Sequence, residues 1–279
     1  MRFFASLLLG AGLLSASGSA RAYCRTTTEQ VPPDYNPEVS GCLTGTALAW
    51  PAMPVAYQVY QGASTQVSLQ QATSIVDESF AKWPAVTCSN GDHPALSVTD
   101  VGPTSTPDPL LHCDASPCTL SRDAVPGIYF RDDAWPYDDQ SNEIALTTVT
   151  YGVDDGHIFA AVMEINSHDH VFSTTVTTDP SVLSLEAVVT HEAGHFVGMA
   201  HSQTPGAVMD AFYQGDAVTL TSDDIAGICE AYPPAKPSSG CAVGDVSASG
   251  GLGGALLAAV TVVSGLARRR RTTSLASAR

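Results

Sequence analysis

The stretch from His191 to His201 holds the residues best suited to chemistry. It reads His191-Glu192-Ala-Gly-His195-Phe-Val-Gly198-Met-Ala-His201. Residues four apart on a helix share a face, so the imidazoles of His191 and His195 should reach one point. Catalytic zinc is held by three protein ligands and keeps a fourth position open, and His201 is the expected third ligand. The spacing therefore predicts a catalytic zinc site.

Two further residues of this stretch have expected roles. Gly198 lacks a Cβ, so it can adopt a positive φ, end the helix and turn the chain so that His201 reaches the ion. Glu192 follows the first ligand and should point toward the water on the zinc. Zinc lowers the pKa of such a water to about 7. We expect Glu192 to take its proton during attack on a peptide carbonyl and to pass that proton to the leaving amine.

The motif His-Glu-x-x-His-x-x-Gly-x-x-His is the metzincin signature, and the chain resembles this family of zinc metalloproteases. Met209, eight residues past His201, resembles the methionine turn beneath the zinc of that family. Ser202 and the segment Leu220–Tyr232 make the chain similar to the matrixin branch. The resemblance spans most of residues 45–232. It implies an extracellular zinc endopeptidase acting on proteins or peptides, with the substrate antiparallel to an edge strand near His157–Ile165.

The apolar patterns indicate one α+β domain over residues 23–235, and the resemblance implies a twisted, mostly parallel sheet. Residues 23–45 are rich in Pro, Asn, Asp and Gly and are interpreted as an irregular segment. The patterns predict strands over 55–60, 96–101, 127–130, 144–151 and 157–165. They predict helices over 69–83, 181–199 and 221–232, the second being the active-site helix.

Other possible metal ligands lie outside the motif. His157, His168 and His170, with Asp169 nearby, could form a second metal site, but we interpret them as parts of solvated loops. The excess of carboxylates is compatible with Ca²⁺, although the chain has no EF-hand spacing and no ligand is assigned. One catalytic Zn²⁺ is thus the only cofactor with named ligands.

Charge narrows the classes of partner. The chain has 279 residues and a net charge of −16, and residues 23–235 contain four basic and 27 acidic side chains. A nucleic-acid partner is excluded because phosphate binding needs clustered Lys and Arg. The negative electrostatic field of the folded part should instead attract cations and basic substrates. We expect the protein to act as a monomer.

Both ends of the chain have the pattern of targeting segments. Residues 1–22 have an early Arg, a short apolar run and a small-residue end, which is typical of a secretory signal peptide. A Pro/Ser/Gly linker, residues 236–245, precedes residues 246–279, where an uncharged stretch long enough to span a membrane is followed by four arginines. This ending resembles the MYXO-CTERM sorting tag. The resemblance implies processing and surface attachment at Cys241, whereas a permanent single-pass anchor is the alternative; an exported protein is predicted either way.

Seven cysteines fit an oxidising compartment. With Cys241 assigned to the tag, six remain for three disulfides, and the short loop between Cys113 and Cys118 makes this pair the simplest. By elimination, Cys24 would pair with Cys42, and Cys88 with Cys229. A bond from Cys24 to the zinc is an alternative, whereas no C-x-x-C spacing supports a cysteine-held metal.

Two other function classes stay open. A metal-binding surface adhesin could keep the fold without cutting, although such a protein has no use for a base at Glu192. A zinc hydrolase acting on amide bonds of cell-wall material would use the same zinc water. Both alternatives share the metal site and differ in what reaches it.

Overall fold

The computed structural model describes residues 22–32, 34–37, 39–106, 125–137, 143–215 and 217–234, together with the backbone of a strand over 271–278. The predicted Cys113–Cys118 pair and the anchor residue Cys241 lie outside the described residues. The predicted signal peptide and the uncharged stretch of the C-terminal tail lie outside them as well. No helix in the described part is long and apolar enough to cross a membrane.

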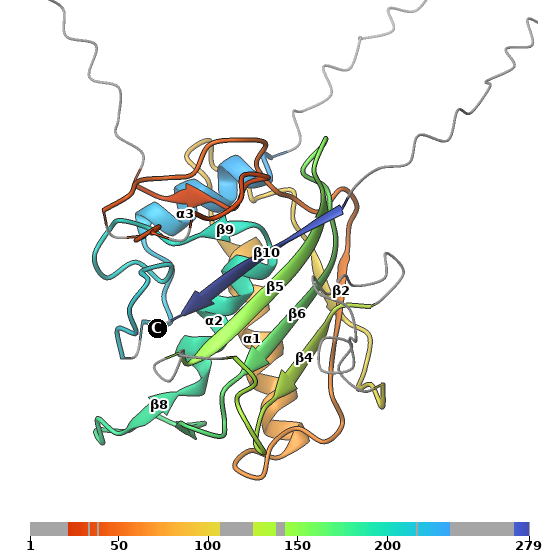
Figure 1. Ribbon diagram of the computed structural model, residues 1–279, viewed down its shortest axis with the longest axis vertical. Helices are drawn as coiled ribbons and strands as arrows, with labels where there is room; N and C mark the ends of the chain where they lie inside the picture. Colours follow the sequence, from red (N-terminus) through yellow and green to blue (C-terminus); the bar gives the residue numbers. More distant parts are fainter. Residues whose placement is uncertain are drawn as a thin grey trace, which may run out of the picture.

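A twisted, mixed sheet forms the centre of the domain (Figure 1). Its six strands lie in the order β10-β5-β6-β4-β2-β3. The strands are β2 (Val55–Val59), β3 (Val98–Asp100), β4 (Gly127–Phe130), β5 (Ala145–Gly152), β6 (Ile158–Ile165) and β10 (Arg271–Ala278). The pairs β2–β3, β2–β4 and β4–β6 are parallel, whereas β5 is antiparallel to both β6 and β10. This confirms the expected α+β fold with a mostly parallel sheet.

The expectation that His157–Ile165 is an edge strand is wrong. It forms β6, which lies inside the sheet between β5 and β4. The turn at Gly156, with φ of +68°, joins β5 and β6 as the sequence predicts. The outer of these two strands is therefore β5, which is buried along its whole length. Burial on both faces removes the apolar–polar alternation that distinguishes edge from centre in a sequence.

Helix α1 (Leu69–Ala85) and helix α2 (Leu185–Phe196) pack against each other on one face of the sheet (Figure 1). Ser68 begins α1 with a capping box to Gln71. The helix runs through Pro84 rather than ending before it, so the predicted end is two residues short. Helix α2 is capped by Ser184, and every residue from Ala187 to Phe196 is buried. A helix buried all round is fixed by the core rather than by an amphipathic face.

The remaining elements lie around the two ends of α2. Strand β7 (Val171–Ser173) pairs with β8 (Val182–Ser184) just before the helix, in a region predicted as helical from residue 181. Helix α3 (Ser222–Ala231) begins at the cap Thr221 and lies over the far end of α2. Residues Val182–Ser184 form a strand here because they pair with Val171–Ser173, a contact that local periodicity does not show.

Residues 23–45 are not wholly irregular, which corrects the sequence-based expectation. Cys24–Arg25 form β1, which pairs antiparallel with β9 (Met199–Ala200) directly after α2. Disulfides join Cys24 to Cys42 and Cys88 to Cys229. The first bond holds the β1 segment, and the second joins the chain after α1 to α3.

Candidate metal centre

Three imidazoles meet at one point beside the sheet. The Nε2 atoms of His191 and His195 are 3.1 Å apart, and that of His201 lies 3.3 Å from that of His195. One ligand atom from each of the three lies within 4.8 Å of the others. A tetrahedral zinc with bonds of about 2.0–2.1 Å places its nitrogen ligands about 3.3–3.4 Å apart. The two distances to His195 are close to this value, and the triad is consistent with one bound zinc ion.

The other nitrogens of two rings are held by backbone carbonyls. Nδ1 of His191 lies 2.6 Å from the carbonyl oxygen of Val208, and Nδ1 of His195 lies 2.9 Å from that of Met199. A carbonyl only accepts, so each Nδ1 carries the hydrogen and each Nε2 keeps its lone pair. Burial lowers the pKa of both rings, and that of His195 falls further because of its two histidine neighbours. Both rings are therefore neutral and ready to bind a cation.

The turn at Gly198 directs the chain from the end of α2 toward His201. Its φ of +91° lies in the left-handed region, and a Cβ there would lie 2.4 Å from the carbonyl oxygen of Leu48. Strain and lack of space together restrict this position to glycine. The amide of Gly198 donates to the carbonyl of His195, which closes the last turn of α2. The chain then runs through β9 to His201, as the sequence predicts.

Side chains from distant segments cap the C-terminal end of α2 by donating hydrogen bonds to its last carbonyls. The indole of Trp50 donates to the carbonyl of Phe196 at 2.8 Å, and the hydroxyl of Tyr232 donates to that of Val197 at 3.0 Å. Burial raises the pKa of Tyr232 to about 12, so its hydroxyl stays a donor. These carbonyls have no partner within the helix and would otherwise be buried without a hydrogen bond. Sequence reasoning missed both caps, because nothing local links residue 50 or 232 to the motif.

Glu192 is fully buried beside the sheet. Its Oε2 accepts a hydrogen bond of 2.6 Å from the hydroxyl of Thr147, on β5. Thr147 is itself fully buried and was not singled out in the sequence. A Thr in a strand of mixed Thr, Val and Leu gives no local sign that its side chain faces a carboxylate 45 residues away. The contact joins the motif helix to the outer strand of the hairpin.

Met209 lies beneath the helix, as expected for a methionine turn. It is fully buried, and a Cβ on Gly194 would lie 2.3 Å from its sulfur, so the helix and the turn are in close contact. The buried carboxylate of Asp224 accepts from the backbone amides of Val208 and Met209, at 3.0 and 3.1 Å. The same carboxylate accepts from the cap Thr221 of α3. The sequence analysis did not single out Asp224, because its contacts with Val208 and Met209 come from another helix.

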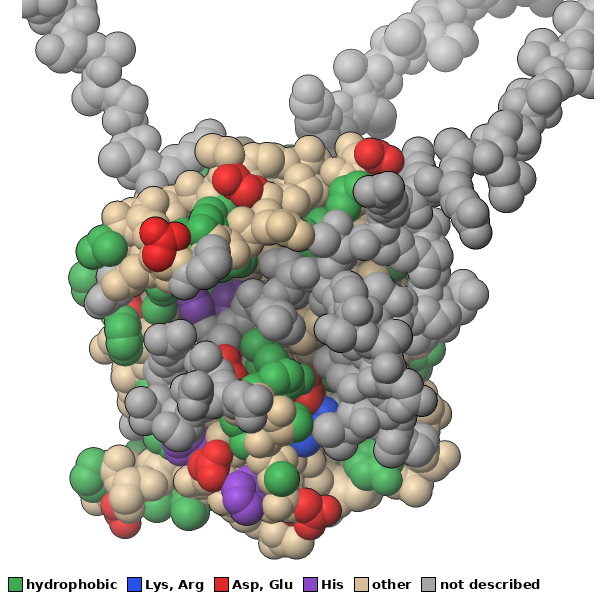
Figure 2. Space-filling model, in the orientation of Figure 1, with side chains coloured by type: hydrophobic (Ala, Val, Ile, Leu, Met, Phe, Trp, Pro, Cys, Tyr) green, Lys and Arg blue, Asp and Glu red, His purple; other side chains and the backbone are tan. Residues whose placement is uncertain are grey.

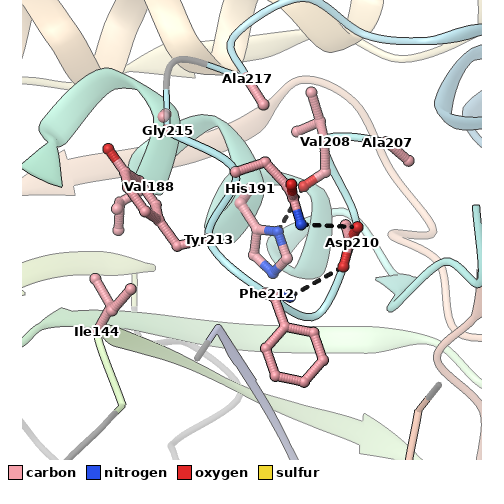
Figure 3. Close-up of a pocket in the computed structure, with 12 residues that line it drawn as sticks. Ile144, Val188, His191, Ala207, Val208, Asp210, Phe212, Tyr213, Gly215 and Ala217 are labelled. Atoms are coloured by element: carbon pink, nitrogen blue, oxygen red, sulfur yellow. Dashed lines mark hydrogen bonds between the residues drawn. The ribbon is translucent and has the colours of Figure 1, made fainter. Parts of the chain in front are cut away.

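A pocket of about 340 Å³, counting the space open to solvent, adjoins His191 (Figure 3). Most of its lining is apolar. It is formed by Ile144, Ala187, Val188, His191, Ala207, Val208, Asp210, Phe212, Tyr213, Gln214, Gly215 and Ala217. The hydroxyl of Tyr213 accepts from the amide of the helix cap Ser184 at 2.7 Å, which ties the far wall to the start of α2. The pocket can therefore hold an apolar side chain directly beside the metal position.

The other histidines do not join this centre. His157 is half-exposed and lies 3.3 Å from Asp155, while Nδ1 of His168 lies 3.1 Å from the carbonyl oxygen of Asp132. Within the described part of the chain, only the set His191, His195 and His201 brings three such ligands together. In the space-filling view, histidine side chains are visible in a recess across the middle of one face (Figure 2).

Comparisons with known proteins agree with the geometry. Residues 123–233 match the family model Peptidase_M10, described as Matrixin. Matrilysin of Rattus norvegicus is 35% identical over 105 residues, which are 36% of this chain and 35% of that protein. Metalloendoproteinase 1-MMP of Arabidopsis thaliana is 39% identical over 80 residues, 28% of this chain and 21% of that protein. Matrix metalloproteinase-C of Caenorhabditis elegans is 25% identical over 197 residues, 66% of this chain and 28% of that protein.

The matched segment of this chain thus spans little more than a third of rat matrilysin. The segment that matches the family model, residues 123–233, contains α2, the three histidines, the turn at Met209 and α3. These similarities support a matrixin-like metzincin, and the histidine triad is consistent with the catalytic zinc of that family.

Proposed function

We propose that the chain is an exported zinc-dependent endopeptidase. The observation that carries the proposal is that the Nε2 atoms of His191 and His201 lie 3.1 and 3.3 Å from that of His195, while the next residue after His191 is the fully buried Glu192. Zinc bound there supplies a Lewis acid and a water of lowered pKa. His191, His195 and His201 are the proposed ligands. Val208 and Met199 orient the first two through their carbonyl oxygens.

Glu192 is the proposed general base. It directly follows the first ligand, and the hydroxyl of Thr147 orients its carboxylate through Oε2. In this arrangement Glu192 takes a proton from the attacking water and returns it to the leaving amine. Thr147 limits the rotation of the carboxylate, so the acceptor oxygen does not need to be ordered anew in each cycle. Met209 supports the floor of the site by packing under Gly194.

The outer edge of β5 is the proposed path of the substrate. In the structure this edge pairs antiparallel with β10 of the same chain, from Arg271 opposite Gly152 to Ala278 opposite Ala145. An extended peptide can use the same backbone donors and acceptors, as in other cases of strand addition. The apolar pocket beside His191 then accepts the side chain that follows the scissile bond. The negative field favours substrates with basic residues outside this pocket.

Several features of the sequence add to the proposal without being tested. The two disulfides support a location where thiols are oxidised. Attachment through Cys241, the division into signal, catalytic domain, linker and tail, bound Ca²⁺ and a monomeric state stay predictions. Neither the adhesin nor the cell-wall hydrolase is favoured by the similarity to matrixins.

The proposal can be tested on Glu192→Gln. The substitution keeps the size of the side chain and removes the base, so casein hydrolysis should fall at least 100-fold while one zinc per chain is retained. Glu186→Gln is the matched control, because Glu186 lies on the same helix, pairs with Lys82 at the surface and has no role in the chemistry.

A chelator should stop casein cleavage by the wild type, and zinc should restore it. Full activity in Glu192→Gln would refute the mechanism. Cleavage of cell-wall amides without casein cleavage would favour the second alternative. Zinc binding with no hydrolysis of either substrate would favour the adhesin.

A further inference from the structure

We propose that Thr26 is a positioning residue of the metal centre, acting through the carbonyl of Met199 on the ligand His195. The inference rests on the proposed function, in that it takes the three histidines to hold zinc. Thr26 lies 173 residues from Met199 in the chain and outside the segment that matches the matrixin family.

Two donors meet at one buried oxygen. The hydroxyl of Thr26 lies 2.8 Å from the carbonyl oxygen of Met199, and Nδ1 of His195 lies 2.9 Å from the same oxygen. A carbonyl oxygen has two lone pairs, so both bonds can form together. Thr26, Met199 and His195 are all buried, so water does not offer a replacement donor. The hydroxyl therefore fixes the oxygen that sets the orientation of the His195 ring.

The backbone around Thr26 is held on both sides. Its amide donates to the carbonyl of Gly198 at 3.0 Å, and its carbonyl accepts from the amide of Leu48 at 2.8 Å. The guanidinium of Arg25 donates to the carbonyl of Gly198 at 3.1 Å and also to that of Leu48. The disulfide of Cys24 closes this segment onto Cys42. Thr26 cannot shift toward another partner, and its bond to Met199 is a fixed part of the fold.

The same contact bears on the third ligand. Met199 lies in β9, two residues before His201, and β9 pairs with β1 through Arg25 opposite Met199. A group that holds the Met199 carbonyl therefore acts on the orientation of His195 and on the path of the chain to His201. Partners that orient a ligand directly alter metal affinity by about 10–100-fold when removed. Thr26 acts one step further out, so the lower end of that range, about 10-fold, is expected.

An ordinary structural hydrogen bond is the competing explanation, and the neighbouring residue provides its control. Thr27 is as deeply buried as Thr26, and its hydroxyl donates to the carbonyl of Thr44 at 2.6 Å. Thr27→Val removes a buried hydroxyl from the same segment without touching the Met199 carbonyl. Both valine variants should lose similar stability, whereas only Thr26→Val should lose metal affinity.

The test compares the full chain as wild type, Thr26→Val, Thr26→Ser and Thr27→Val. Zinc affinity is measured by competition with a chromophoric chelator, the visible spectrum of the Co²⁺-loaded protein reports ligand geometry, and thermal unfolding is followed without metal. We expect about 10-fold weaker zinc binding and an altered Co²⁺ spectrum in Thr26→Val. Thr26→Ser and Thr27→Val should remain within about twofold of the wild type. If the valine at position 26 prevents folding, Thr26→Ala against Thr26→Ser gives the same comparison with smaller side chains.

Equal zinc affinities and Co²⁺ spectra in Thr26→Val and Thr27→Val would overturn the inference and leave the proposed function standing. The same holds if Thr26→Ser binds zinc as weakly as the variant that lacks the hydroxyl. Failure of the wild type to bind zinc would refute the proposed function itself, so the two failures are distinguishable.

Discussion

Replacing Gly198 by Ala tests how the end of α2 delivers the third histidine. Two costs apply at this position. A side chain at φ of +91° is strained by about 1–2 kcal/mol, and the new Cβ would lie 2.4 Å from the backbone oxygen of Leu48. Relief of that contact needs a backbone shift, which costs about 1–3 kcal/mol by analogy with overpacking. The free energy of unfolding should therefore fall by about 2–5 kcal/mol.

Gly91→Ala is the matched control. Gly91 has φ of +87°, but nothing lies within 4 Å of the position of its Cβ, so only the backbone strain applies. Urea denaturation of the metal-free proteins should show a loss of about 1–2 kcal/mol for Gly91→Ala and a clearly larger loss for Gly198→Ala. The shift at Gly198 displaces the path to His201, so zinc binding should also weaken in that variant and remain unchanged in Gly91→Ala.

Equal losses of stability in the two variants would refute this reasoning, because the contact with Leu48 would then contribute nothing. Zinc affinity unchanged in Gly198→Ala would contradict the assigned role of the turn even if the stability loss were as large as expected.

Two other predictions concern the hydrogen bonds of Asp132 and the outer edge of β5. Burial raises the pKa of Asp132, but hydrogen bonds from Ser167, Thr65 and Ser64 lower it by more, so its net pKa lies below the ordinary value. Its charged form therefore stabilises the fold above about pH 4, and this contribution is lost as the pH falls through the lowered pKa. Asp132→Asn should make the acid dependence of unfolding shallower than in the wild type, and identical pH profiles of the two proteins would contradict this. A synthetic peptide with the sequence of residues 271–278 should inhibit peptide hydrolysis competitively, by raising KM without lowering kcat, because its backbone pairs with β5. A peptide of the same length with N-methylated alternate amides cannot donate to the strand and should not inhibit, and equal inhibition by both peptides would exclude the edge as the binding path.

The sequence predicts that His191, His195 and His201 meet, because the signals for this are local. His191 and His195 are about one helical turn apart. Glycine readily adopts a positive φ, which predicts that the helix ends near Gly198, and Gly198 does adopt a positive φ in the structure. The two disulfides that lie in the described residues pair as elimination suggests. Strand and helix positions agree within a few residues, which is the precision that periodicity allows at the ends of elements.

The sequence does not predict the long-range contacts that hold the Met199 carbonyl, Glu192 and the turn at Met209 in place. Thr26 donates to the carbonyl of Met199 across 173 residues, and Thr147 donates to Glu192 across 45. Asp224, on α3, accepts from the amide of Met209, and each of the three has an ordinary local sequence context. The order of strands is likewise set by pairing between distant segments. β5 is buried along its whole length and β6 nearly so, and only the partner on the far side decides which of the two lies nearer the centre of the sheet.

The Cys88–Cys229 bond makes the stability of the fold around the histidine triad depend on the oxidation of two thiols. It closes a loop of 141 residues, and the chain-entropy model gives such a cross-link about 5 kcal/mol of stabilisation. That is comparable with the whole net stability of a small domain. The bond restrains α3, whose Asp224 holds the turn under the histidines. A chain among reducing thiols lacks this restraint, so the turn beneath the three histidines would gain its full support only after oxidation of Cys88 and Cys229.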